Sequence, residues 1–138
     1  MTLNRRQFIG GAVACGGGLC AAGCTAVNPA PTVDAAADGS FDLPAELAKP
    51  GGQVKARIPG ADDLVLVWKT EDGYGAAEIT CTHLGSEVHL NASAKTLDCP
   101  SHGSRFGLDG KVVHGPAKQA LKAYQVAVYG ARVRLQPA

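Results

Sequence analysis

The chain has 138 residues, of which 46% are hydrophobic, 18% charged and 5% aromatic, and its formal net charge is +1. This length suits one domain, and the balanced charge excludes the basic surface that nucleic-acid binding requires, so no nucleic-acid partner is expected. The 18 glycines and the few aromatic residues favour a small, turn-rich β domain over a helical bundle.

Residues 1–27 are predicted to be an export signal that takes no part in the fold. Arg5 and Arg6 stand just before an apolar stretch, Phe8–Val27, which contains six glycines. The arrangement resembles the twin-arginine signal, whose pathway exports folded proteins. This resemblance implies a location in the bacterial periplasm or at the outer face of the cytoplasmic membrane.

Three fates of the signal after export remain open. The residues Ala21-Ala22-Gly23-Cys24 resemble the end of a lipoprotein signal, in which the cysteine is lipidated. Such signals prefer leucine three positions before the cysteine, where this chain has Ala21. Simple cleavage would release a soluble protein. Retention would attach the protein to the membrane through its N-terminus, since twenty residues can span a bilayer, although six glycines make a poor span.

Residues 28–39 are rich in alanine and proline and lack apolar periodicity, which predicts a flexible tether. From residue 40 onward, short apolar or alternating runs between Gly and Pro turns predict short strands. In the strand expected at Gln53–Ile58, the apolar residues Val54, Ala56 and Ile58 alternate with polar residues. Trp68, at the end of the next expected strand, is expected in the core. The expected strands are Ser40–Leu43, Gln53–Ile58, Leu64–Trp68, Gly75–Thr80, Glu87–Leu90, Lys95–Asp98, Ser104–Leu108, Lys111–Val113, Tyr124–Val128 and Arg132–Leu135.

Two short segments carry the chemistry that the sequence predicts. Cys81 and His83 form a C-x-H pattern, and after fifteen intervening residues Cys99 and His102 form C-x2-H. Two thiolates for one iron and two imidazoles for the other suit a binuclear iron–sulfur cluster. A tetrahedral zinc site is the alternative, although zinc motifs usually group like ligands. The segments Cys-Thr-His-Leu-Gly and Cys-Pro-x-His-Gly-Ser resemble the two signature loops of the Rieske family.

This resemblance, which covers roughly residues 54–135, implies an all-β fold and one [2Fe-2S] cluster. The expected domain spans residues 40–138. It has an antiparallel β-sandwich or barrel base with a small inserted cluster-binding subdomain at about residues 81–117. Leu84 and Pro100 are expected to shield the cluster from water, and Gly115-Pro116 matches a family segment that covers it. The residues expected around the cluster are Leu84, Gly85, Ser86, Pro100, Ser101, Gly103, Ser104, Phe106, Gly115 and Pro116.

Two departures from the high-potential members of the family concern the tuning of the cluster. Ser104 matches a family serine whose hydroxyl donates to a bridging sulfide. Phe106, however, stands where those members have a tyrosine that donates to a ligand sulfur. Ser86 and Ser101 stand where they have cysteines that join the loops by a disulfide. Hydrogen bonds to sulfur stabilise the reduced form, so a potential in the lower half of the Rieske range, about −150 to +300 mV, is predicted.

The leading functional interpretation is an exported carrier that passes single electrons between redox protein partners, which dock at the outward-facing His83 and His102. An electron carrier or electron-transfer subunit is favoured over an enzyme acting alone, and no catalytic residue is expected. Two alternatives stay open. One is the Rieske subunit of a quinol-oxidising cytochrome bc-type complex, and the other is the small subunit of a periplasmic molybdenum oxidase such as arsenite oxidase. His89 and His114 lack ligand spacing and are expected at the surface.

Overall fold

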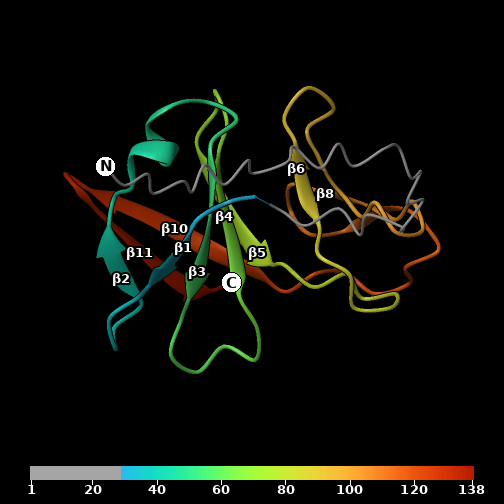
Figure 1. The fold of residues 1–138 in the computed structure, drawn as a ribbon, viewed down its shortest axis with the longest axis horizontal. Helices are drawn as coiled ribbons and strands as arrows, with labels where there is room; N and C mark the ends of the chain where they lie inside the picture. The colour runs from blue at the N-terminus through green and yellow to red at the C-terminus, as the bar shows by residue number, and fades with distance from the viewer. Residues whose placement is uncertain (1–28) are drawn as a thin grey trace, which may run out of the picture.

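The computed structural model describes residues 29–138, which form two β-sheets placed side by side (Figure 1). The base sheet has the strand order β1-β3-β4-β5-β10-β11-β2, and the small sheet has the order β6-β7-β8-β9. The predicted all-β fold is confirmed. The elements are β1 Thr32–Asp34, β2 Ser40–Asp42, the 3-10 helix η1 Ala45–Ala48, β3 Gln53–Arg57, β4 Val65–Lys69, β5 Tyr74–Glu78, β6 His89–Asn91, β7 Thr96–Asp98, β8 Arg105–Gly107, β9 Val112–His114, β10 Ala123–Tyr129 and β11 Arg132–Pro137.

Strand β4 separates two hydrophobic cores, because successive side chains of a strand point to opposite faces. Val65 and Val67 lie in the core of the base sheet, whereas Leu66 and Trp68 lie in the core shared with the small sheet. Trp68 is thus buried as predicted. We call the second cluster the small-sheet core, and its buried members are Leu66, Trp68, Ala77, Ile79, Cys81, Val88, Leu97, Cys99, Phe106, Ala117 and Leu121.

The small sheet is formed by the chain between β5 and β10, two strands that pair with each other in the base sheet. Strands β6 and β7 pair antiparallel, as predicted, so the segments that precede β6 and follow β7 lie at the same end of the sheet. The predicted Asp109-Gly110 turn joins β8 to β9. Gly110 has a φ of 82°, a left-handed conformation that glycine adopts without strain.

Part of residues 28–39, the segment expected to be a flexible tether, forms a short strand. Thr32–Asp34 forms β1, which pairs parallel with β3, and the Lys55 N–H donates to the Pro31 carbonyl oxygen (2.8 Å). Ala30 packs against the small-sheet core. Three residues of a strand give too short a pattern to predict, because their pairing depends on a partner some twenty positions away. The four-residue helix η1 was not predicted either.

The alternation of apolar and polar residues along β3 does not separate a buried face from an exposed one in its central part. Val54 and Ala56 lie in the base core as expected, but Lys55 on the opposite face is also buried. The predicted features Arg5, Arg6 and Cys24 lie outside the described residues. Within residues 29–138, no helix has the length and apolar character that crossing a bilayer requires.

Candidate iron–sulfur site

Residues 81–86, the first loop, and residues 99–104, the second loop, close by the same two backbone hydrogen bonds. The Cys81 N–H donates to the Ser86 carbonyl oxygen (2.7 Å), and the Gly85 N–H donates to the Cys81 carbonyl oxygen (3.0 Å). In the second loop, the Cys99 N–H likewise donates to the Ser104 carbonyl oxygen (2.8 Å), and the Gly103 N–H donates to the Cys99 carbonyl oxygen (3.1 Å). Two hexapeptides of one backbone shape therefore face each other.

A glycine and a serine end both loops, but the histidine differs in position. Gly85 and Gly103 have φ values of 80° and 79°, so each stands where the chain needs a left-handed residue. The imidazole comes from the third residue of the first loop, His83, and from the fourth residue of the second, His102. Their ring centroids are 5.0 Å apart and the ring planes meet at 84°. The two loops thus bring both imidazoles to one tip.

The two thiols lie on the inner side of the imidazoles. Cys81 and Cys99 are 2% and 3% exposed and belong to the small-sheet core. Burial raises the pKa of the Cys99 thiol, and the neighbouring Cys81 acts in the same direction, while hydrogen bonds from the backbone at Ser101 and His102 lower that pKa. Those amides therefore point toward the Cys99 sulfur, where they favour negative charge.

These side chains fit a [2Fe-2S] cluster. The Nδ1 of His83 is buried and has no hydrogen-bond partner, a costly state for a ring nitrogen unless another group binds it. Among residues 29–138, no three Cys, His, Asp or Glu side chains surround a single metal position. The four side chains are arranged as a buried thiol pair and an outer imidazole pair, the distribution that a binuclear Rieske centre uses.

The third loop, residues 115–121, is attached to both of the others. The Ala117 N–H donates to Ser104 Oγ (3.0 Å) in the second loop, and Thr82 Oγ1 in the first loop donates to the Gln119 carbonyl oxygen (2.6 Å). Gly115-Pro116, joined by a cis peptide bond, lies exposed beside the tip. Because Ser104 accepts from Ala117, its own hydroxyl proton can be donated to a different acceptor. Thr82 and Ala117 were not predicted as site residues.

The other predicted site residues fall into a buried and an exposed group. Phe106 is completely buried in the small-sheet core, paired across the strands with Leu97 of β7. Leu84 is 67% exposed and Pro100 is also exposed, so both form the outer surface of the tip. Of the two remaining histidines, His114 is exposed as predicted, whereas His89 is half-buried. The prediction that His89 lies at the surface is therefore only partly correct.

Ser86 and Ser101 join the first loop to the second. The Ser101 hydroxyl donates to Ser86 Oγ at 2.7 Å, across 15 positions of sequence. A neutral hydrogen bond at an exposed site stabilises a protein weakly, by about 0.5–1.5 kcal/mol. The two loops are therefore linked at the positions where high-potential members of the family have a disulfide, but the serine hydrogen bond is a much weaker link.

The double variant Ser86→Cys/Ser101→Cys is expected to form a disulfide, because the two oxygens already lie in contact. Closing a loop of about 15 residues should stabilise the protein by roughly 3 kcal/mol. Thiol titration and mass spectrometry would detect the bond, and thermal unfolding with and without reductant would measure its effect. The single variant Ser86→Cys is the matched control. A double variant with two free thiols under air would show that the loop geometry cannot accept the bond.

Comparison with known proteins agrees with this geometry. The Rieske [2Fe-2S] domain family matches residues 42–125. The chain is 36% identical to the cytochrome b6-f complex iron-sulfur subunit 3 of Nostoc sp. over 156 aligned residues, which cover 99% of this chain and 86% of that subunit. The chain spans only 17% and 40% of the length of two other curated relatives.

Two solved structures share the fold. The plasma membrane Rieske protein PetC3 from Synechocystis is 29% identical with a TM-score of 0.59, over 70% of this chain and 97% of that chain. The ferredoxin of carbazole 1,9a-dioxygenase from Nocardioides aromaticivorans is 26% identical with a TM-score of 0.60, over 72% of this chain and 98% of that chain. Since the family match spans more than half of the sequence, this chain belongs to the Rieske [2Fe-2S] family, whose cofactor is one [2Fe-2S] cluster.

Proposed function

We propose that this chain is an exported electron-transfer protein that passes single electrons between redox protein partners. Cys81 and Cys99 hold the inner iron, and His83 and His102 hold the outer iron. The observation that carries the proposal is the arrangement of a buried thiol pair behind an imidazole pair, one of whose nitrogens, His83 Nδ1, is buried without a partner. When bound, a Rieske cluster accepts and releases one electron at a time.

The surrounding residues decide how readily the site takes up an electron. The small-sheet core excludes water from the thiols, and the backbone amides of Ser101 and His102 donate toward the Cys99 sulfur. Ser104 is placed to donate its hydroxyl proton. Phe106, by contrast, offers no donor. With Phe106 in place of a donor and a weak serine link between the loops, the potential is expected in the lower half of the range of about −150 to +300 mV.

The tip formed by His83 and His102 is the surface at which redox partners dock. His102 is exposed, and the exposed side chains of Leu84, Pro100 and Pro116 stand around the same end of the molecule. An apolar surface of this kind can exclude water from a contact while keeping the imidazoles close to the partner. The electron therefore enters and leaves through the imidazole side and not through the buried thiols.

Electron paramagnetic resonance of the reduced, purified protein tests this function directly. A rhombic Rieske signal from one cluster per chain, with a reversible one-electron titration, is the expected result. Protein made with intact cluster-assembly machinery that is colourless, lacks labile sulfide and holds one zinc per chain would contradict the proposal. Such a result would favour the tetrahedral alternative for Cys81, His83, Cys99 and His102.

A second candidate is a Rieske subunit of a quinol-oxidising complex. It is favoured by the Nostoc relative, which is named as a cytochrome b6-f complex subunit and aligns with 99% of this chain. Purification of the native protein from membranes in mild detergent separates the two candidates. Stoichiometric b-type haem in the purified material indicates the complex, and protein without haem that still exchanges electrons indicates a separate carrier.

Export by the twin-arginine route and lipid attachment at Cys24 complete the proposal. Because β1 begins at Thr32, residues 25–31 are all that separate Cys24 from the base sheet. Even fully extended, they reach about 25 Å at roughly 3.5 Å per residue. Attachment at Cys24 therefore keeps the folded domain close to the outer face of the cytoplasmic membrane.

Cys24→Ser is expected to move the protein from the membrane fraction to the soluble periplasmic fraction, because it removes the atom that would carry the lipid. Immunoblots of fractionated cells measure the change. Replacing both Arg5 and Arg6 with lysine should instead retain the protein in the cytoplasm, and Cys20→Ser is the control. Membrane attachment that survives Cys24→Ser would point to a retained anchor.

A further inference from the structure

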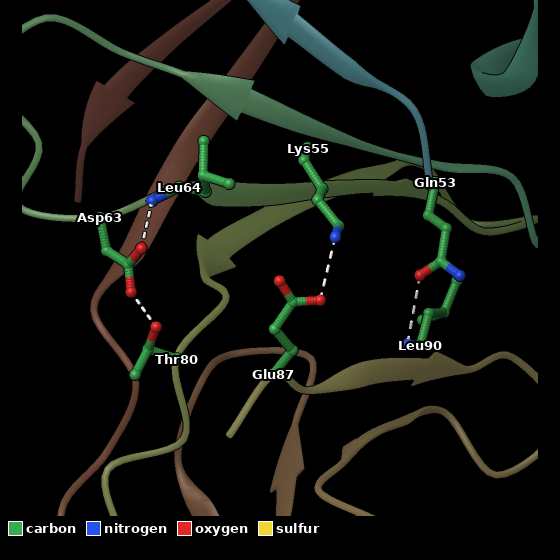
Figure 2. A network of polar contacts seen from close by, with 7 residues as sticks. All are labelled: Gln53, Lys55, Asp63, Leu64, Thr80, Glu87 and Leu90. Atoms are coloured by element: carbon green, nitrogen blue, oxygen red, sulfur yellow. Dashed lines mark hydrogen bonds and ion pairs between the residues drawn. The ribbon is translucent and has the colours of Figure 1, made fainter. Parts of the chain in front are cut away.

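The first loop is held at both ends by residues that lie in, or just before, strands of the base sheet (Figure 2). At its start, Thr80 precedes Cys81, and the Thr80 hydroxyl donates to Asp63 Oδ2. The other carboxylate oxygen of Asp63 accepts the Leu64 N–H at 2.7 Å. Asp63 lies just before β4, so this contact joins the entry to the loop to a central strand of the base sheet.

The end of the first loop is held by a charged pair. Glu87 follows Ser86 and forms an isolated antiparallel bridge with Thr80, which closes the base of the loop. The Lys55 Nζ donates to Glu87 Oε2 at 2.9 Å, and the two side chains are 9% and 33% exposed. Figure 2 shows the two side chains pointing toward each other, Lys55 from β3 and Glu87 from the segment after the loop.

The contacts that β3 makes differ along its length. Gln53, two residues before Lys55 on the same face, accepts the Leu90 N–H with its Oε1 at 3.3 Å. Arg57, two residues after Lys55, pairs with Asp34 at 3.0 Å, but those side chains are 68% and 76% exposed. The same strand therefore carries one partly buried ion pair beside the first loop and one exposed pair away from it.

We propose that the Lys55–Glu87 ion pair positions the first loop and that its two charges set the reduction potential of the cluster. The inference rests on the proposed electron-transfer role. Reduction adds one negative charge to the site. A cation on a shielded side chain stabilises that charge and an anion opposes it, because the interaction is weakly screened away from water. Lys55 therefore raises the potential and Glu87 lowers it.

Voltammetry of Lys55→Met and Glu87→Gln tests the proposal, since the two variants remove charges of opposite sign. Lys55→Met is expected to lower the potential and Glu87→Gln to raise it, while the double variant lies between them. Arg57→Met, which removes the exposed cation of the same strand, should leave the potential unchanged. Unchanged potentials in both Lys55 and Glu87 variants, or shifts of both in one direction, would overturn the inference.

Two further measurements keep the result interpretable. If Lys55→Met does not assemble a cluster, Glu87→Gln carries the test alone, because its amide oxygen can still accept from Lys55. An unshifted potential in Glu87→Gln would then overturn the inference. The spectrum of the wild-type protein separates the two proposals: absence of a Rieske signal there contradicts the proposed function, whereas a normal signal with unshifted variants contradicts only the role of the ion pair.

Discussion

Cys99→Ser is expected to yield a folded, colourless protein without a [2Fe-2S] cluster. Cys99 is 3% exposed in the small-sheet core, and the only other cysteine among the described residues is Cys81. Each iron of a Rieske centre has only two protein ligands, so loss of one thiolate removes half of the protein's hold on the inner iron. Absorption spectroscopy, iron and sulfide analysis and electron paramagnetic resonance would measure the loss.

The fold should survive this change because serine preserves the backbone contacts of the second loop. The Cys99 N–H donates to the Ser104 carbonyl oxygen and the Cys99 carbonyl oxygen accepts the Gly103 N–H, neither of which involves the sulfur. Circular dichroism should therefore show the wild-type strand content. Ser101→Ala, which removes only the hydrogen bond between the loops, is the matched control and should retain the cluster. A full cluster in Cys99→Ser would refute the assignment of Cys99 as a ligand.

The sequence predicts the strands well where local pattern determines them. Each of the ten expected strands overlaps an observed one, because apolar alternation and Gly or Pro turns are local signals. Strand β1 was missed for a physical reason: its three residues pair parallel with β3, and nothing near Thr32–Asp34 in the sequence signals that partner. The composition of residues 28–39, rich in alanine and proline, does not show which of their backbone groups form hydrogen bonds with a distant strand.

The candidate site was predictable in its ligand types but not in its supports. Both loops can be located from the spacing of Cys81, His83, Cys99 and His102. The matching backbone hydrogen bonds that close the two loops, however, are seen only in the three-dimensional structure. Lys55 shows the limit most clearly. Nothing near Lys55 in the sequence signals that its side chain is buried, but the structure covers it and places Glu87, just after the first loop, opposite it. A buried lysine becomes recognisable only when the second layer is known.

Phe106→Tyr is expected to raise the reduction potential of the cluster. Phe106 is completely buried in the same core as Cys81 and Cys99, and it pairs with Leu97 across the small sheet. The change adds one hydroxyl to this interior. If that hydroxyl donates to a ligand sulfur, it stabilises the extra negative charge of the reduced form and the potential rises. Protein-film voltammetry and a redox titration would measure the shift.

The stability of the variant distinguishes this result from a simple disturbance of the core. A buried hydroxyl without a partner costs about 1–3 kcal/mol, whereas a hydroxyl bonded to sulfur avoids most of that cost. A raised potential should therefore accompany nearly wild-type resistance to denaturant. Phe106→Leu, which changes the packing and adds no donor, should lose stability without raising the potential. An unchanged potential together with reduced stability in Phe106→Tyr would show that the hydroxyl finds no sulfur, and Phe106 would no longer explain a low potential.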